Sequence, residues 1–333
     1  MPYPANGRAN TMDRLHIAYA TDNGYLMPTA VSLASAVKEC SNKQELAFDI
    51  LDTGIDDEKW QKFETMVRMS LGRDFGICRH RMDVPKYRKY KSWHGSWGTY
   101  ARLDLPNILK NLAWCVYADG DTLFINDPLR LREIFDAQFA LQAHRDWEFP
   151  DGGNIAHHEH WHLQNNLKWN KDDYFCAGFA LLNLEWFRQN DASRKCFEFI
   201  DNHPTIEFPD QDALYNICKG YTKFLPDEWG RFSWGAFVDE KRGLIHYASD
   251  LPCKLMSSKY PDYNDAHKLW FDTARDVYGL GWRDLMVAPS WARYVKKRVI
   301  GYALSMLRMF KDCYPITRLS RLNDYLTRHY QAR

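Results

Sequence analysis

Two aspartates one residue apart, Asp119 and Asp121, directly follow a run of strand-forming apolar residues. Gly120 between them lets the backbone turn so that both carboxylates can reach one ion or its water shell. Mg²⁺ and Mn²⁺ prefer oxygen ligands of this kind and commonly bridge to substrate phosphates. The pair is therefore a candidate site for a divalent cation that holds a phosphorylated ligand.

Two other interpretations of the pair have to be weighed. Aspartyl-phosphate phosphatases carry the pattern D-x-D-G-T after the first strand of their fold. Here Thr122 comes one place early, and the pair lies far from the N-terminus, which disfavours that chemistry. A solvated turn with two acidic residues has the same spacing, so the pair alone leaves the turn and the cation site open.

The elements that would position this pair belong to an α/β fold. Strands are expected at 15–22, 46–54, 75–82 and 114–118, and helices at 30–40, from 56 onward and at 99–109. This alternation predicts a mostly parallel sheet with right-handed crossovers. Because ligands bind beyond the carboxyl ends of such strands, we expect Asp22 to face the same crevice as Asp119 and Asp121.

The rest of the chain continues this pattern and then changes character. Further strands are expected at 139–146, 175–184, 223–229 and 243–249, and further helices at 185–190 and 210–220. We expect a disordered leader at 1–13, one domain at 14–280 and a basic helical extension at 281–333.

Composition excludes several classes of protein. The chain of 333 residues is 45% hydrophobic with a net charge of +1, which is ordinary for a globular protein. No apolar run reaches the ~18 residues of a membrane span, and the N-terminus lacks the apolar core of a signal peptide. The eight cysteines form no C-x-x-C pair, which favours reduced thiols over disulfides or a zinc site. We expect a cytoplasmic protein.

The segment 281–333 is strongly basic, in contrast to the preceding residues. Within 289–311, apolar residues recur at helical spacing beside Arg293, Lys296, Lys297 and Arg298. A basic amphipathic helix of this kind can lie on an anionic membrane surface, although it could equally dock on its own domain. Nucleic-acid binding is disfavoured because no recognised module surrounds the segment.

Seven blocks of the sequence resemble, in order, the family 8 retaining glycosyltransferases, particularly the bacterial lipooligosaccharide galactosyltransferases. The blocks are IAYATDNGYLMPTAVSLASAV, FDILDTGID, TYARLDLPNIL, VYADGDTLFINDPL, YFCAGFALLNLEWF, FPDQDALYN and LIHYAS. The resemblance implies a single-domain, Rossmann-like, nucleotide-sugar-binding fold of the GT-A type. It further implies transfer of galactose or glucose from a UDP-hexose to a glycan or glycolipid acceptor, at a membrane if the basic segment binds one.

The same resemblance assigns roles to individual residues. Asp119, Asp121 and His246 would bind Mn²⁺ (or Mg²⁺), although a lone histidine after an apolar strand is otherwise a core residue. Residues expected to contact the nucleotide, its diphosphate or the donor sugar are Ala18, Thr21, Asp22, Asn23, Tyr25, Arg102, Asp119, Gly120 and Lys254. The residues expected at the reacting sugar are Asp146, Asp210 and Gln211.

Gln211 bears on the mechanism because, by the same resemblance, it takes the place of the family residue that lies nearest the far face of the reacting carbon of the donor sugar. Retaining glycosidases use a carboxylate nucleophile on that face, and a neutral amide is a poor replacement. We therefore expect a front-face path, in which the acceptor hydroxyl attacks on the side from which UDP departs.

Two motifs depart from the family pattern. Cys176 stands where the family often has asparagine, so one contact to sugar or acceptor would be lost or rerouted. In the late motif H-x-x-G-x-x-K, Ser249 replaces glycine and Pro252 replaces lysine, leaving Lys254 two places late. These departures support an alternative, a non-catalytic binder of nucleotide sugars or carbohydrates, whereas the complete set of Asp119, Asp121 and His246 argues against it.

The histidine-rich run 157–162 invites a metal-site interpretation. Because successive histidines of the run are spaced one, two and two residues apart, and the run falls where the family has a variable loop over the acceptor, we predict an acceptor-side or lid loop.

Overall fold

The computed structural model describes residues 14–93, 95–146, 153–233, 243–248, 251–253 and 265–279. The expected leader 1–13, the basic segment 281–333 and Lys254 lie outside the described residues.

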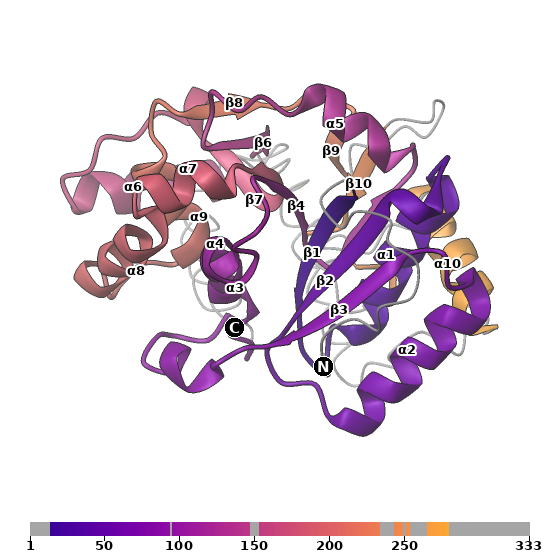
Figure 1. Cartoon of the computed structure of the whole chain (residues 1–333). Helices are drawn as coiled ribbons and strands as arrows, with labels where there is room; N and C mark the ends of the chain where they lie inside the picture. The colour runs from indigo at the N-terminus through magenta and orange to yellow at the C-terminus, as the bar shows by residue number, and fades with distance from the viewer. Residues whose placement is uncertain are drawn as a thin grey trace, which may run out of the picture.

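A seven-stranded sheet with the order β3-β2-β1-β4-β7-β6-β8 forms the centre of the molecule (Figure 1). Its strands are β1 (Leu15–Thr21), β2 (Leu46–Asp52), β3 (Gly76–Arg81), β4 (Cys115–Ala118), β6 (Leu141–Arg145), β7 (Phe175–Leu182) and β8 (Thr222–Phe224). β3, β2, β1 and β4 are parallel, whereas β7 is antiparallel to both β4 and β6. The expected mostly parallel sheet is confirmed, with β7 as the reversed strand.

A smaller sheet lies beside the large one, with the order β5-β10-β9. It consists of β5 (Thr122–Phe124), β9 (Trp229–Phe232) and β10 (Leu244–His246). β5 follows β4 after the Asp119–Asp121 turn, and β10 pairs with it in antiparallel fashion, so that His246 lies opposite Thr122. The small sheet thus brings a residue late in the chain to the carboxyl end of β4.

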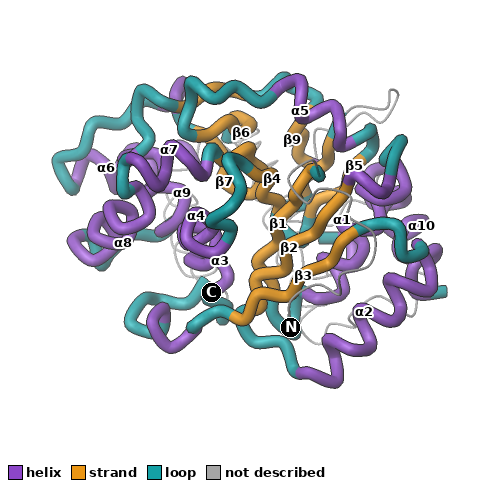
Figure 2. The backbone as a smooth tube through the Cα atoms, in the orientation of Figure 1, coloured by secondary structure: helices purple, strands orange, loops and turns teal. Residues whose placement is uncertain are grey.

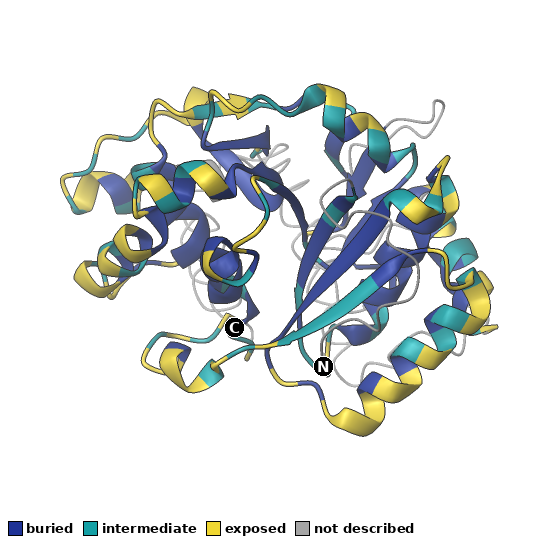
Figure 3. Cartoon of the chain, in the orientation of Figure 1, coloured by how far each residue is buried: buried dark blue, intermediate teal, exposed yellow. Residues whose placement is uncertain are grey.

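Helices cover both faces of the large sheet (Figure 2). They are α1 (Leu26–Glu39), α2 (Asp57–Leu71), α3 (Gly98–Ala101), α4 (Leu105–Ile108), α5 (Leu131–Ile134), α6 (Gly153–Gln164), α7 (Leu184–Gln189), α8 (Ala192–Asn202), α9 (Pro209–Ile217) and α10 (Asp265–Tyr278). Tyr19 and Phe48 pack with α1 and α2 in one apolar core, while Tyr117 packs with α7 to α9 in another. The strands between these two cores are largely buried (Figure 3). Among the described residues, no helix combines the length and apolar character that crossing a membrane would require.

The helix expected at 99–109 is interrupted. α3 ends at Ala101, a 3₁₀ turn covers Arg102–Asp104, and α4 begins at Leu105. Pro106 explains the break, because it has no N–H to donate to a carbonyl of the preceding turn. Arg102 is buried at this interruption, beside the end of β4.

A buried ionic cluster lies on the large sheet, away from the Asp119–Asp121 turn. Asp49 is 3% exposed and binds His16 Nδ1 and His80 Nε2, each at 2.7 Å. Burial opposes ionisation of Asp49, but the hydrogen bonds from His16 and His80 lower its pKa. Burial likewise lowers the pKa of His80, but its hydrogen bonds to Asp49 and Cys78 raise that pKa to about 9.

This cluster predicts a pH dependence of stability. Because the pKa of His80 is about 9 in the folded chain and 6.5 in the reference state, its contribution is complete below pH 6.5 and is lost as the pH rises through 9. Unfolding by urea should therefore show wild-type protein losing more stability over this interval than His80→Gln, which keeps a neutral donor to Asp49. Parallel pH profiles for the two proteins would contradict the assignment.

Candidate functional site

Three side chains with metal-ligating atoms converge at the carboxyl end of β4. Asp119, Asp121 and His246 each place one ligand atom within 4.8 Å of the others. The Tyr247 N–H donates to the Asp121 carbonyl at 2.8 Å, which ties the end of β10 to the turn. The structure thus brings together the three residues that the resemblance assigns to a cation.

The turn that carries the two aspartates is held closely by its neighbours. The Asp119 N–H donates to the Gly178 carbonyl at 2.7 Å, and the Thr122 hydroxyl donates to the Asp119 carbonyl at 2.8 Å. A Cβ on Gly120 would lie 2.5 Å from Thr29 Oγ1. Glycine is therefore needed at position 120 for the turn to approach the start of α1.

Arg102 occupies the centre of the site. Its Nη2 donates to Asp119 Oδ1 at 2.7 Å, and its Nη1 donates to the Ala177 carbonyl at 2.7 Å and lies 3.0 Å from Asp210 Oδ2. Burial lowers the pKa of Arg102, but Asp119 and Asp210 raise it further, so the guanidinium stays charged. The Tyr117 hydroxyl also donates to Asp119 Oδ1 at 2.7 Å. Oδ1 of Asp119 thus already accepts hydrogen bonds from within the protein, whereas Oδ2 lies near Gly178 and His246.

The electrostatics of the aspartate pair fit a cation. Burial, reinforced by Asp121, raises the pKa of Asp119 despite Arg102. Burial also opposes ionisation of Asp121, but His246 lowers its pKa. Among the described residues, the buried Asp121 Oδ1 has no hydrogen-bond partner, and His246 Nε2 lies 3.5 Å away. Two carboxylates and an imidazole form a donor set that suits Mn²⁺, with one buried oxygen that no described residue satisfies.

Gln211 is fixed at both ends of its amide. Its Oε1 accepts from the Ala177 N–H at 2.9 Å, and its Nε2 donates to Asp146 Oδ2 at 2.9 Å. Gln211 and Asp210 lie in the first turn of α9. The three residues expected at the donor sugar are therefore connected to one another and, through Asp210, to Arg102.

The loop after β1 reaches the same site. Asp22 Oδ1 accepts from the N–H groups of Gly24 and Tyr25 at 2.8 and 3.2 Å, which is a local Asx turn. Burial and the charges of Asp121, Asp119 and Asp22 raise the pKa of Tyr25, and the Tyr25 ring lies against Gly120 between the two aspartates. Asp22 and the pair thus share one region, as the strand ends predict.

Three other predicted residues of this region have different surroundings. The Thr21 hydroxyl accepts from Thr29 at 3.1 Å, and Asn23 bonds to Asp56 through both ends of its amide. Ala18 has no exposed surface inside β1, so the structure does not place it on the wall of the site.

The prediction of a loop for the histidine-rich run 157–162 is wrong, because the run lies in helix α6. His158 and His162 are four residues apart and share a buried face of the helix. This four-residue spacing is missed when only successive histidines of the run are compared. Both lie near Asp212 Oδ1, with His158 Nδ1 at 3.5 Å and His162 Nε2 at 3.8 Å. His158 also contacts the Tyr174 hydroxyl at 2.9 Å, so this helix supports the α9 wall of the site.

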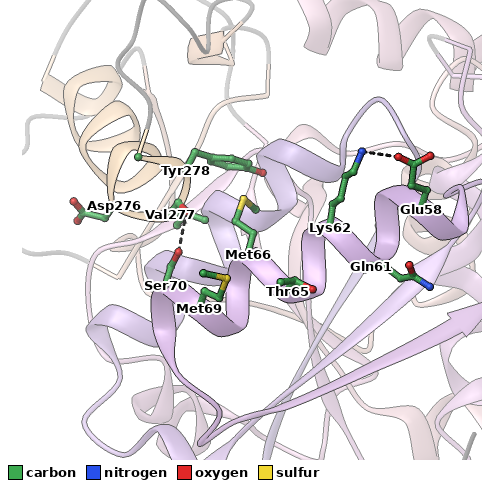
Figure 4. A pocket seen from close by; sticks show the side chains of 11 residues that line it. Glu58, Gln61, Lys62, Thr65, Met66, Met69, Ser70, Asp276, Val277 and Tyr278 are labelled. Atoms are coloured by element: carbon green, nitrogen blue, oxygen red, sulfur yellow. Dashed lines mark hydrogen bonds and ion pairs between the residues drawn. The ribbon is translucent and has the colours of Figure 1, made fainter.

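A hollow of about 650 Å³ lies elsewhere, between α2 and α10 (Figure 4). Its wall includes Met66, Met69 and Tyr278, and none of the predicted site residues. The acids and the histidine that the resemblance assigns to a cation lie instead at the carboxyl end of β4.

Comparison with known proteins now decides the family. The family model for glycosyl transferase family 8 matches residues 16–251. The chain belongs to glycosyl transferase family 8.

Two relatives of the chain carry names of glycosyltransferases. A putative glycosyltransferase of Haemophilus influenzae is 28% identical over 257 residues, which are 77% of this chain and 73% of that protein. The lipopolysaccharide 1,3-galactosyltransferase of Salmonella typhimurium is 24% identical and aligns with 64% of this chain and 62% of its own length. The resemblance to lipopolysaccharide galactosyltransferases is thereby confirmed.

The fold is also that of solved glycosyltransferases. The galactosyltransferase LgtC, crystallised with donor and acceptor sugar analogues, superposes with a TM-score of 0.64 at 20% identity. The match covers 81% of this chain and all of LgtC (100%). The expected GT-A type of α/β fold is confirmed.

Gly178 is a residue of the site that sequence reasoning missed. A Cβ at this position would overlap the His246 ring and lie 2.8 Å from Asp119 Oδ2. It lies in the block that carried the family 8 resemblance, directly after Cys176 and Ala177. Only the position of the His246 ring against Gly178 shows why a side chain is excluded there.

Gly178→Ala should therefore displace the His246 imidazole from the aspartate pair. We expect at least about a tenfold weaker affinity for Mn²⁺, measured by electron paramagnetic resonance, with the circular dichroism of the fold retained. Gly98→Ala is the matched control, because its Cβ would meet ordinary contacts of 3.4 Å or more. Equal Mn²⁺ affinity in the two variants would contradict this role for Gly178.

Proposed function

We propose that this chain is a metal-dependent, retaining glycosyltransferase that moves a hexose, galactose or glucose, from a UDP-sugar to a glycan or glycolipid acceptor of the lipopolysaccharide type. The convergence of Asp119, Asp121 and His246 within 4.8 Å carries the proposal. The names of the Salmonella relative and of LgtC support galactose as the transferred sugar.

Asp119 Oδ2, Asp121 and His246 Nε2 would hold the divalent cation, Mn²⁺ or Mg²⁺. When bound, this cation stabilises the negative charge of the departing diphosphate. Arg102 holds Asp119 in place through Oδ1 and keeps a positive charge beside the phosphates. The fixed fork of its guanidinium suits this double task better than a lysine would.

The loop from Thr21 to Tyr25 would bind the uracil and ribose. Its Asx turn aims the Asp22 carboxylate at local N–H groups, while the Tyr25 ring adjoins Gly120. Asp119 and Gly120 would border the ribose from the opposite side. Lys254, which would approach the diphosphate, lies outside the described residues.

Gln211 supports a front-face reaction. Its Oε1 already accepts a backbone hydrogen bond, and its Nε2 is held by Asp146. A neutral amide that is fixed in this way orients the sugar better than it attacks the anomeric carbon. The acceptor oxygen then forms its bond to that carbon as the bond to UDP breaks, and the hydroxyl proton passes to a phosphate oxygen of the departing UDP. Asp146 and Asp210 would position the sugar hydroxyls.

The proposal predicts slow donor hydrolysis that depends on the cation. UDP release from a panel of UDP-sugars with Mn²⁺ should single out one donor, and EDTA or Asp121→Asn should reduce its rate at least about 100-fold. Asp136→Asn changes a partly exposed carboxylate outside the site, paired with Lys223, and should leave the rate unchanged.

Two results would contradict parts of this proposal. Hydrolysis that is unaffected by both EDTA and Asp121→Asn would exclude the cation site. A sugar adduct trapped on Gln211 would exclude the front-face path. Mn²⁺-dependent UDP binding without turnover, with any donor and with added glycan acceptors, would instead favour the non-catalytic binder.

We also propose that residues 289–311 bind an anionic membrane surface, where a lipid-linked acceptor would be found and where a cytoplasmic enzyme would become peripheral. Replacing Lys296, Lys297 and Arg298 by glutamate in the full chain should weaken binding to phosphatidylserine vesicles, by roughly 1 kcal/mol for each charge removed. Vesicle flotation measures this, with phosphatidylcholine vesicles as the control. Equal flotation of the variant and wild type would refute the membrane proposal and leave the donor site untouched.

A further inference from the structure

A second group of metal-ligating side chains lies behind the proposed cation site. His144 on β6, Cys176 on β7 and His246 on β10 are all buried, and each places one ligand atom within 4.8 Å of the others. Cys176 and His144 contribute no atom to the aspartate site. The two groups thus share only the His246 ring.

His144 is oriented as a metal ligand would be. It is 4% exposed, and its Nδ1 lies 3.0 Å from the Arg145 carbonyl, to which it can only donate. That hydrogen bond leaves the lone pair on Nε2, which has no hydrogen-bond partner among the described residues. A backbone carbonyl bound to the other nitrogen is the usual support of a ligating histidine.

The neighbouring backbone makes room for this ring. Gly230 has a φ of +121°, and a Cβ there would overlap His144. The His144 and His246 rings stand nearly perpendicular, with an interplanar angle of 89° and centroids 5.6 Å apart. Burying a nitrogen without a hydrogen-bond partner costs free energy. Here that nitrogen is His144 Nε2, which lies beside the thiol of Cys176 and the imidazole of His246.

The two nitrogens of His246 face different chemistry. Nε2 lies 3.5 Å from Asp121 Oδ1, whereas Nδ1 lies 3.7 Å from Cys176 Sγ. One side offers carboxylate oxygens, which hard cations prefer. The other offers sulfur and nitrogen, which borderline and soft cations prefer.

We propose that His144, Cys176 and His246 Nδ1 form a second cation site, for Zn²⁺ or a cation of similar softness. One thiolate and two imidazoles are three ligands of a tetrahedral zinc site, with the fourth position left for water. Binding replaces the proton of the Cys176 thiol, which is released to the solvent. The absence of a C-x-x-C pair, which disfavoured zinc in the sequence, does not apply to ligands drawn from three separate strands.

The cluster of Asp49, Cys78 and His80 is a weaker candidate for such a site. Both Asp49 oxygens already accept hydrogen bonds from His16 and His80 at 2.7 Å, so the protein itself satisfies that carboxylate.

The shared imidazole couples the second site to the first. A neutral histidine has one lone pair, so a cation on Nδ1 leaves the ring proton on Nε2, which faces Asp121. Zn²⁺ in the second site should therefore weaken Mn²⁺ binding at Asp119 and Asp121. This coupling rests on the proposed function, whereas the existence of the second site does not.

Co²⁺ added to the full chain tests the site, because thiolate ligation of Co²⁺ gives a near-ultraviolet charge-transfer band that oxygen ligands do not give. We expect the band with about one equivalent of Co²⁺, its loss in Cys176→Ser and Cys176→Asn, and its displacement by Zn²⁺. It should persist in Cys40→Ala, a buried thiol at the end of α1, and in Asp119→Asn. Absence of the band in wild-type protein, or its persistence in a folded Cys176 variant, would overturn the proposal.

Competition with Mn²⁺ then tests the coupling. Zn²⁺ can also enter the aspartate site directly, so we expect displacement of Mn²⁺ from Cys176→Ser to require about tenfold more Zn²⁺ than displacement from wild type. Displacement at the same Zn²⁺ concentration in both proteins would overturn the coupling. If wild-type protein binds no Mn²⁺, the proposed function loses its cation site, while the cobalt band still decides the second site.

Discussion

A buried guanidinium holds the site together. Arg102 is 8% exposed and contacts Asp119, Asp210 and the Ala177 carbonyl at once. A buried charge is tolerated only when its partners are in place, and here the partners are the buried Asp210 and the partly buried Asp119. The contact therefore fixes the end of β4, the start of α9 and the middle of β7 relative to one another.

The chemistry of the site depends on that constraint. Arg102 and Tyr117 both bind Oδ1 of Asp119, which leaves Oδ2 facing His246 as the oxygen available to a cation. Asp210 is held from the other side, and Gln211, the next residue of α9, is positioned with it. One interaction thus relates the proposed cation ligands to the proposed sugar-binding residues. The reversed strand β7 takes part because Ala177 and Gly178 supply carbonyls to Arg102 and to Asp119.

Much of the fold follows from local sequence patterns. Strands that alternate with amphipathic helices predicted the parallel part of the sheet, and the carboxyl ends of β1 and β4 predicted which acids share a crevice. The reversal of β7 was not predictable, because a strand buried on both faces reads the same in either direction. Pro106 could have predicted the break in the helix expected at 99–109.

Long-range packing accounts for what the sequence left undetermined. The need for glycine at 178 arises only when the His246 ring lies against it, and the partners of His144 come from strands far apart in sequence. The buried face of His158 and His162 was readable as an i, i+4 pair but was obscured by His160 between them. The family resemblance named the roles of Asp119, Asp121 and His246, which stay predictions until ligand binding is measured.

Calorimetric titration of UDP into the protein tests the central claim most directly, with Mn²⁺, with EDTA, and with Mn²⁺ and His246→Ala. The account predicts that UDP binds with Mn²⁺ and that its affinity falls at least about tenfold both in EDTA and in the variant. Equal UDP affinity under all three conditions would show that Asp119, Asp121 and His246 do not hold a cation against the diphosphate.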